Sequence, residues 1–380
     1  MIHGMISITP FSQIGLSIPL HRTIRYATWI PQCVPNASTL SVTHARPRQG
    51  NSISDLSVSC ASDVLQVLLR YCSGDFWIGS GGIVAALSLS SSSSSSSSPS
   101  RTSSSMSFMG KLNVVRAIEN LRDAHGMGNA DVVVLTGDSA GGAGVIYNVD
   151  MLQSMLPGVH VFANPVGGSF PINAVYSGPE STSVASAQLL DPRSMRSYLR
   201  LFNATTTLTP REFARIEVAA PLYPVEYLTD FLTTSLYAGV PLEKDSSSGS
   251  TLKLKWISPS TVSVAADPIP RNRTEVYAYL EEYAASVVSL LMDIGAGTAA
   301  SCYLHTNVDV TWPVVNGATA LDGLNRWMNA IINYRAARHA SGLPASVSDD
   351  IGGVYLNIDQ CDGNGYWPPC NPTCPRDAGR

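Results

Sequence analysis

A short apolar run that ends in a glycine-rich turn is the feature that most constrains the fold of this chain. Val132–Leu135 is predicted to be a buried strand, and the sequence TGDSAGG follows it directly at 136–142. A strand, a G-x-S-x-G turn and an apolar helix in this order are typical of a nucleophile elbow, in which the turn exposes a serine hydroxyl above a parallel sheet. Small residues are needed there because the serine backbone is strained and the helix packs close to the strand. A plain strand-to-helix turn is the alternative, since G-x-S-x-G also recurs by chance.

The rest of the chain alternates between strand patterns and helix patterns, which predicts an α/β fold. Apolar runs of strand length are followed by segments with apolar residues three and four positions apart. Strands are predicted at Val64–Tyr71, Val132–Leu135, Val159–Val166 and Ala219–Leu228, and helices at Leu112–Leu121, Val145–Leu152, Glu275–Met292 and Leu321–His339. This alternation implies a doubly wound, mainly parallel sheet with functional side chains at the carboxyl ends of its strands.

Composition divides the chain into three parts. Residues 1–58 are rich in Ser, Thr, Pro and Gln and show no sustained strand or helix period, so 1–63 is expected to be an irregular segment. Residues 64–375 are expected to form one α/β domain, and 376–380 a short tail. Within the domain, the low-complexity segment 88–105 contains nine consecutive serines. It is expected to be a disordered insert, because it cannot bury enough apolar area to offset chain entropy.

Charge and hydropathy exclude two classes of partner. The 380 residues have a formal net charge of −4 and no basic cluster, so the electrostatic footprint of a nucleic-acid-binding protein is missing. No apolar run approaches the roughly 18 residues that a membrane span requires. The first twenty residues lack the basic start and the continuous apolar run of a signal peptide, and none is expected in this chain.

Four of the seven cysteines cluster late in the chain. Their positions among Asn, Pro and Gly indicate a disulfide-linked C-terminal segment and an oxidising compartment. These cysteines are Cys302, Cys361, Cys370 and Cys374. A zinc site is the alternative, but no histidine lies near the last three, and no metal is expected. Four cysteines allow three pairings, of which Cys302 with Cys361 and Cys370 with Cys374 is one. The glycosylation acceptors of a secreted chain would be Asn36, Asn203 and Asn272.

A serine at such a turn needs a base, and the base needs an acid that orients it. In the α/β-hydrolase arrangement the chain order is Ser, then Asp or Glu, then His. His160, His305 and His339 follow Ser139, and only His305 lies in a loop expected at the rim of the sheet. Among the acidic residues between them, only Asp230 follows an apolar strand at its carboxyl end.

These positions define a candidate catalytic set. We expect Ser139 to be the nucleophile, His305 the general base and then the general acid, and Asp230 the group that orients the imidazole. The backbone N–H of Ala140 is expected to donate to the oxyanion, because the residue after the nucleophile normally does so. The positive end of the helix dipole lies at the same place.

Several segments resemble the pectin acetylesterase/Notum family of carbohydrate esterases. The resemblance is carried by LTGDSAGGAGVIYNVD at 135–150, YCSGDFW at 71–77, the strand at 221–230, CYLH at 302–305, and the stretch from Cys361 through WPPCNPTCP at 367–375. In the family, the strand like 221–230 contains the catalytic Asp. The resemblance covers roughly residues 64–375.

The resemblance implies a secreted, cofactor-free serine carboxylesterase with an α/β-hydrolase fold. Family members remove acetyl groups from pectin or, in animals, a fatty acyl group from signalling proteins. The implied partner is therefore an acetylated polysaccharide or an acylated protein. Asp75 and Trp77 fall on the Tyr-Cys-x-x-Asp-x-Trp segment and are candidates for the substrate pocket. Their alternatives are a turn cap for Asp75 and packing beneath the elbow helix for Trp77.

One family feature has no counterpart in this sequence. Family members have a Gly-Gly-Gly-Trp-Cys-like loop before the segment that resembles 71–77, and it provides further oxyanion N–H groups. Residues 1–63 contain nothing of this kind, so the N-terminal part of the sheet is expected to be incomplete and activity to be low. The alternative function is a catalytically impaired relative that binds a glycan or an acylated partner without turnover.

Overall fold

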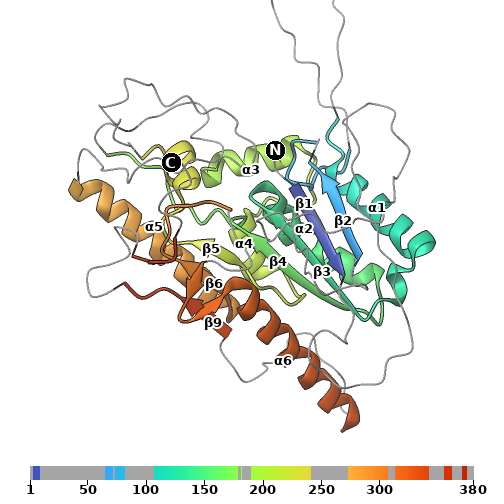
Figure 1. The fold of residues 1–380 in the computed structure, drawn as a ribbon. Helices are drawn as coiled ribbons and strands as arrows, with labels where there is room; N and C mark the ends of the chain where they lie inside the picture. Colours follow the sequence, from blue (N-terminus) through green and yellow to red (C-terminus); the bar gives the residue numbers. More distant parts are fainter. Residues whose placement is uncertain are drawn as a thin grey trace, which may run out of the picture.

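The fold is built around one mainly parallel sheet. The computed structural model describes residues 3–8, 65–71, 73–81, 107–178, 181, 190–240, 273–306, 313–341, 355–361 and 370–374. Within these parts a seven-stranded sheet has the order β2-β1-β3-β4-β5-β6-β9 (Figure 1). From β3 to β9 the neighbouring strands are parallel, and β1 is antiparallel to both β2 and β3. This is the predicted doubly wound sheet.

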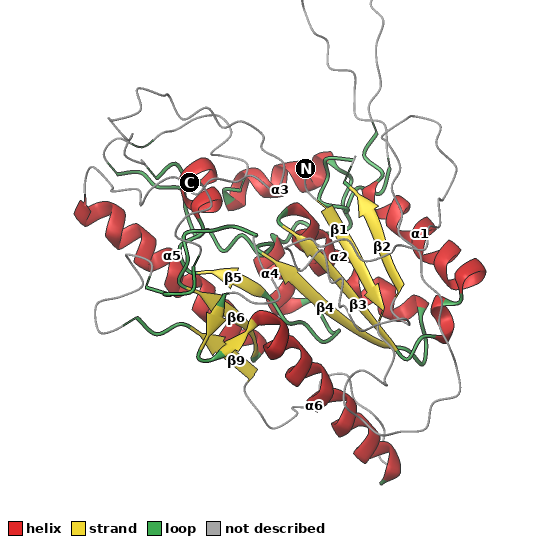
Figure 2. Cartoon of the chain, in the orientation of Figure 1, coloured by secondary structure: helices red, strands yellow, loops and turns green. Residues whose placement is uncertain are grey.

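The elements follow the chain as an alternation of strands and helices (Figure 2). The strands of the sheet are β1 (His3–Ile8), β2 (Leu65–Arg70), β3 (Val132–Asp138), β4 (His160–Val166), β5 (Val225–Tyr227), β6 (Ala296–Ala300) and β9 (Tyr355–Ile358). β7 (Val314–Val315) and β8 (Ala318–Thr319) form a separate two-stranded pair. The helices are α1 (Gly110–His125), η3 (Met127–Asn129), α2 (Ala140–Met155), α3 (Pro192–Leu201), α4 (Pro210–Ile216), η5 (Leu232–Tyr237), α5 (Arg273–Ile294) and α6 (Ala320–Ala340).

Strand alternation distributes the apolar side chains of the sheet between two helical layers. Val133 and Leu135 of β3 pack with the buried faces of α1 and α2, whereas Val132 and Val134 pack with α6. Successive side chains of a strand point to opposite faces, so a strand covered on both sides is apolar throughout. The uninterrupted valine run of β3 therefore reflects burial on both faces, as its sequence predicted.

Helix α2 is central to the fold. Its residues from Ala140 to Val149 are all buried, and its small side chains allow close packing. A Cβ on Gly144 would collide with the indole of Trp77. The absence of an amphipathic pattern in this helix thus follows from contacts on every side.

The expectation that residues 1–58 contain no regular element is wrong at His3–Ile8. This segment forms β1, which pairs with β2 from His3 opposite Arg70 to Ile8 opposite Leu65 and with β3 from Gly4 opposite Gly137 to Ile8 opposite Val133. Its six residues, HGMISI, show too short a pattern to predict a strand. Pairing with residues far along the chain defines this strand, and local periodicity does not report such pairing.

Other predictions differ in extent. The strand expected at Ala219–Leu228 is reduced to β5 (Val225–Tyr227), and Leu222 makes only an isolated bridge to Ala163. β6, β9, α3 and α4 were not predicted. The expected insert 88–105, the tail 376–380 and the acceptors Asn36 and Asn272 lie outside the described residues. In the described part of the chain, no helix combines the length and apolar character needed to cross a bilayer.

Candidate active site

The elbow geometry explains why its sequence is rich in glycine. Ser139 lies between β3 and α2 with a positive φ of 56°, and its N–H donates to Val166 O at 2.8 Å. A Cβ on Gly137 would lie 2.6 Å from the carbonyl of Gly141, across the turn. The first glycine of G-x-S-x-G, Gly137, is therefore required by close backbone approach, because no side chain fits there between strand and helix.

Two hydrogen bonds connect the three predicted side chains. Ser139 Oγ lies 2.7 Å from His305 Nε2, and His305 Nδ1 lies 2.6 Å from Asp230 Oδ2. All three are buried, with exposed fractions of 7 % for Ser139 and His305 and 1 % for Asp230. A carboxylate only accepts hydrogen bonds, so the imidazole donates through Nδ1 and accepts from the serine hydroxyl through Nε2. This arrangement can remove a proton from Ser139.

The Asp230 carboxylate is held by the first turn of η5. Thr233 donates its backbone N–H to Oδ1 at 2.8 Å and its hydroxyl to Oδ2 at 2.9 Å. η5 is a π-helix (Leu232–Tyr237) that begins two residues after Asp230. Short π-helical segments are frequent at functional sites. Sequence reasoning missed Thr233, although a threonine three residues after an Asp is the spacing of such a local bond.

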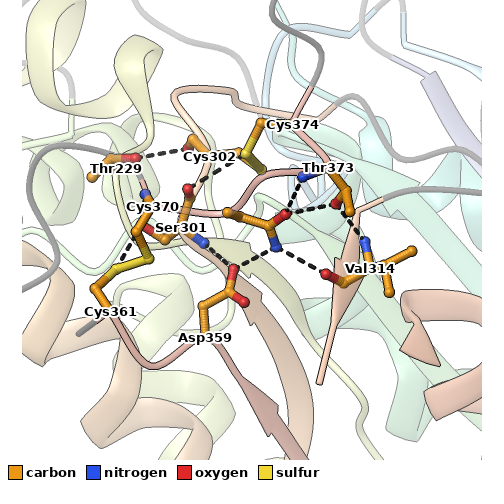
Figure 3. Close-up of a disulfide and its surroundings, with 10 residues drawn as sticks. Thr229, Ser301, Cys302, Val314, Asp359, Cys361, Cys370, Thr373 and Cys374 are labelled. Carbon is orange, nitrogen blue, oxygen red and sulfur yellow. Dashed lines mark hydrogen bonds between the residues drawn. A yellow bond between two sulfur atoms is a disulfide. The ribbon is translucent and has the colours of Figure 1, made fainter. Parts of the chain in front are cut away.

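Two disulfides hold the segment that precedes His305 (Figure 3). Cys302 pairs with Cys374 and Cys361 with Cys370. The pairing of Cys302 with Cys361 and Cys370 with Cys374 is thus wrong. It fails because Cys302 follows β6 while Cys361 and Cys370 close a separate short loop after β9, and proximity along the chain does not reveal this arrangement.

Hydrogen bonds connect the same segment to both neighbouring strands. Ser301 N–H donates to Asp359 Oδ2 at 2.7 Å, and Thr229 Oγ1 donates to Cys302 O at 2.8 Å (Figure 3). Thr229 directly precedes Asp230. The hydroxyl of the residue before the carboxylate therefore holds the backbone three residues before the imidazole.

Asn371, in the Cys-Asn-Pro-Thr-Cys sequence, makes several hydrogen bonds that hold the C-terminal segment in place. Its Nδ2 donates to Asp359 Oδ2 at 2.7 Å and to Val314 O at 3.0 Å, and its Oδ1 accepts from Thr373 N at 2.8 Å. Its own N–H donates to Ser301 O. The buried Asn371 thus connects the C-terminal segment to Val314 and Asp359 through its side chain and to Ser301, after β6, through its backbone.

The first residue of α2 supplies the candidate oxyanion donor. Ala140 is buried and follows Ser139 directly. Amides in the first turn of a helix have no partner within the helix, and the dipole favours negative charge there. The N–H of Ala140 thus lies in the first turn of α2, and its role as an oxyanion donor stays a prediction.

The charge of His305 also acts on two further carboxyl groups. Burial raises the pKa of Asp138 to about 7, opposed by the charge of His305. Burial likewise raises the pKa of Glu226 to about 7, opposed by the hydrogen bond from the backbone N–H of Ser169. Both carboxyl groups therefore change charge close to neutral pH, so the electrostatics of the site depend on pH.

Asp75 and Trp77 make the contacts expected of a turn cap and of a side chain packed beneath the elbow helix. The Asp75 carboxylate accepts from Trp77 N, Gly79 N and Gly110 N and so joins its own turn to the start of α1. Trp77 is buried, packs against Gly144 of α2 and lies 5.4 Å from the ring of Tyr71. These contacts give the substrate-pocket role no support, because both side chains are buried and contact other parts of the chain.

The remaining site predictions concern modification and metals. Asn203 is exposed in a left-handed turn, and its Nδ2, the atom that a glycan would modify, donates to Gly81 O at 2.6 Å. Within the described ranges, no group of three or more His, Cys, Asp or Glu side chains could hold a metal ion.

Comparisons with known proteins identify the family of this chain. The family model for pectinacetylesterase matches residues 64–375. The chain is 24% identical over 325 residues to palmitoleoyl-protein carboxylesterase notum1' of Xenopus laevis, covering 81% of this chain and 56% of the relative. It is 23% identical to palmitoleoyl-protein carboxylesterase NOTUM of Homo sapiens, over 81% of this chain and 55% of the relative.

The fold also resembles a solved structure. The Wnt deacylase Notum from Drosophila matches with a TM-score of 0.51 and 20% identity, covering 82% of this chain and 74% of that chain. The chain spans about half the length of the curated relatives it matches.

Proposed function

The chain belongs to the pectinacetylesterase family, and from that membership we propose that it is a serine carboxylesterase with Ser139 as nucleophile, His305 as base and Asp230 as orienting acid. The observation that supports this most directly is the pair of hydrogen bonds from Ser139 to His305 and from His305 to Asp230, at 2.7 and 2.6 Å. The proposed catalytic domain covers residues 64–375.

In the proposed reaction, His305 Nε2 takes the hydroxyl proton while Ser139 Oγ bonds to the ester carbonyl carbon. The Ala140 N–H and the N-terminus of α2 stabilise the resulting oxyanion. His305 then gives the proton to the leaving alcohol as the acyl–oxygen bond breaks. A water molecule repeats the sequence on the acyl-enzyme and releases the carboxylic acid. Asp230 keeps the proton on Nδ1 and stabilises the imidazolium that forms in each step.

The proposed substrate is an O-acyl ester on a polysaccharide or a protein. The family name refers to pectin acetyl esters, and the names of the vertebrate relatives refer to palmitoleoyl-protein. The two disulfides are typical of proteins from oxidising compartments, and we extend the proposal to a secreted or extracellular protein. Asn203 remains a proposed glycosylation acceptor.

Hydrolysis of p-nitrophenyl acetate and p-nitrophenyl octanoate by the purified protein tests the proposal. Ser139→Ala should lower kcat/KM by roughly 10³-fold or more, because no nucleophile remains. Asp230→Asn should lower kcat by roughly 10⁴-fold, because the imidazole loses the partner that fixes its tautomer. The matched control is Ser154→Ala, which removes an exposed hydroxyl from the same helix α2 and should leave both rates unchanged.

The alternative of a binding-only relative gives a different result. If the wild-type protein and Ser139→Ala hydrolyse both esters at the same rate, the esterase proposal fails. Thermal unfolding of each variant shows whether a loss of rate reflects a loss of fold. The ratio of the acetyl and octanoyl rates measures the preferred acyl length.

A further inference from the structure

A buried carboxyl group beside the site has no role in the proposed proton transfer. Glu226 lies in the middle of β5, opposite Ala299 of β6, and only 1 % of its surface is exposed. Its neighbours Val225 and Tyr227 pack in the apolar cluster that contains α6. Strand alternation therefore directs Glu226 to the opposite face, toward α2 and α5. Burying an acidic group here is costly unless it makes a specific bond.

The bond that Glu226 makes is to the loop after β4. Its Oε1 accepts from the backbone N–H of Ser169 at 3.1 Å. The same loop is anchored on β5 a second time, since Gly167 N–H donates to Val225 O at 2.8 Å. Glu226 is thus the side chain by which β5 holds residues 167–170.

This loop touches the imidazole segment on two sides. A Cβ on Gly167 would lie 2.5 Å from the backbone O of His305, so the two backbones are in close contact. The ring of Phe170 stacks on the imidazole with the centroids 6.4 Å apart and the planes at 25°. Gly168 packs equally closely against Gly142 of α2. The loop 167–170 therefore contacts both the elbow helix α2 and the segment of His305.

We propose that Glu226 is a positioning residue of the site: its carboxylate holds the loop 167–170 against His305 and adds negative charge beside the imidazole. The inference rests on the proposed esterase function. Glu226 touches neither Ser139 nor the ester in this scheme, and it acts through Ser169 and Phe170.

The charge of this carboxyl group changes close to neutral pH. Burial raises its pKa to about 7, and the charge of Asp230 raises it as well, whereas Ser169 and His305 lower it. The charge of Glu226 in turn raises the pKa of Tyr227 from β5 and of Tyr283 from α5. Above pH 7 the anion accepts a charge-assisted hydrogen bond from Ser169 and favours the imidazolium; below pH 7 the neutral acid does neither.

Glu226→Gln separates these two states. The amide keeps the shape and an acceptor oxygen for Ser169 but cannot ionise. We expect kcat for p-nitrophenyl acetate close to wild type at pH 6 and roughly tenfold lower at pH 8, with KM little changed. The acid limb of kcat/KM should move to lower pH by about 0.5 unit, since the imidazolium loses a favourable charge. Glu217→Gln, the same change at an exposed position after α4, is the control.

An NMR titration separates this inference from the proposed function. In the Ser139→Ala background, which removes turnover, the imidazole signal of His305 should titrate at lower pH when Glu226→Gln is added. If the wild-type protein hydrolyses no ester but this shift occurs, the function fails and the inference stands. An unchanged His305 titration together with wild-type kcat at pH 8 overturns the inference.

A second variant covers loss of fold. If Glu226→Gln lacks a cooperative thermal transition, Glu226→Asp tests the proposal in its place. It keeps the charge but is one methylene too short to reach Ser169 N. We expect a reduced kcat with the acid limb unmoved, and a wild-type kcat in this variant overturns the proposed holding role.

Discussion

The residue next to Ser139, the proposed nucleophile, is an acid in an unfavourable environment. Asp138 is the last residue of β3 and is partly buried, and burial raises its pKa to about 7. The ordinary pKa of Asp in an unfolded chain is about 3.9. Between pH 4 and 7 the unfolded chain therefore releases the proton while the folded protein retains it. Stability falls as pH rises through this window, and above pH 7 the full penalty is present.

Asp138→Asn should for this reason stabilise the protein at high pH. We expect the free energy of unfolding to exceed that of wild type by about 1–3 kcal/mol at pH 8 and by little at pH 4. Urea unfolding at the two pH values measures the difference. Asp123→Asn, on the exposed face of α1, is the control and should show no such increase. A stabilisation of equal size at both pH values would rule out an ionic cause.

Chain order and strand ends were enough to select the three side chains that meet at the site. Ser139 came from the elbow sequence, and Asp230 and His305 from their places after apolar runs. Thr233 and Glu226 were not singled out, because a local hydroxyl bond and an acid inside an apolar strand have no distinctive pattern. Phe170 was missed for a related reason: stacking on an imidazole depends on a loop path that the sequence does not encode locally.

At the scale of elements, the junction between β3 and α2 depends on contact between backbones. A Cβ on Gly137 would lie 2.6 Å from both C and O of Gly141. Backbone cannot withdraw as the end of a flexible side chain can, so any substituent separates the strand from the helix. The strained serine backbone at this junction depends on the same close approach.

Gly137→Ala should accordingly destabilise the protein by about 1–3 kcal/mol, because the added methyl group overpacks the junction. It should also reduce ester hydrolysis, since Ser139 would move away from His305. Gly128→Ala in η3, where a Cβ would meet only the flexible side chain of Arg122 at 3.2 Å, is the control and should have little effect. Chemical denaturation and p-nitrophenyl acetate hydrolysis provide the two measurements. Equal destabilisation of both variants would contradict the explanation.

Long periodic elements were predictable, and short paired strands were not. α5 and α6 match the helices expected at 275–292 and 321–339, because their apolar residues recur over several turns. β1 and β9 have six and four residues. Segments of this length become strands through the neighbours they pair with, so their local sequence does not predict them.

At the scale of the whole molecule, one disulfide spans far more chain than the other. Cys302 and Cys374 are 72 residues apart, whereas Cys361 and Cys370 are 9 apart. A crosslink removes more entropy from the unfolded chain when the loop it closes is longer. The long link also lies three residues before His305, so it affects both stability and the site.

Cys302→Ala with Cys374→Ala should cost about 4 kcal/mol, and Cys361→Ala with Cys370→Ala about 3 kcal/mol, by this entropy argument. The first pair should also lower kcat more than the second, because the base would lose its anchor. Urea unfolding and ester hydrolysis of the two double variants compare them directly. A larger loss from the short link would contradict the argument.

The long link also sets an order of events in biosynthesis. Ser139, Asp230 and His305 all leave the ribosome before Asn371 and Cys374, which secure the backbone beside the base. A nascent chain thus contains Ser139, the proposed nucleophile, well before His305 can be fixed against it. Ester hydrolysis is therefore expected to appear only after oxidative maturation, which ties enzymatic competence to the redox conditions of the compartment where folding is completed.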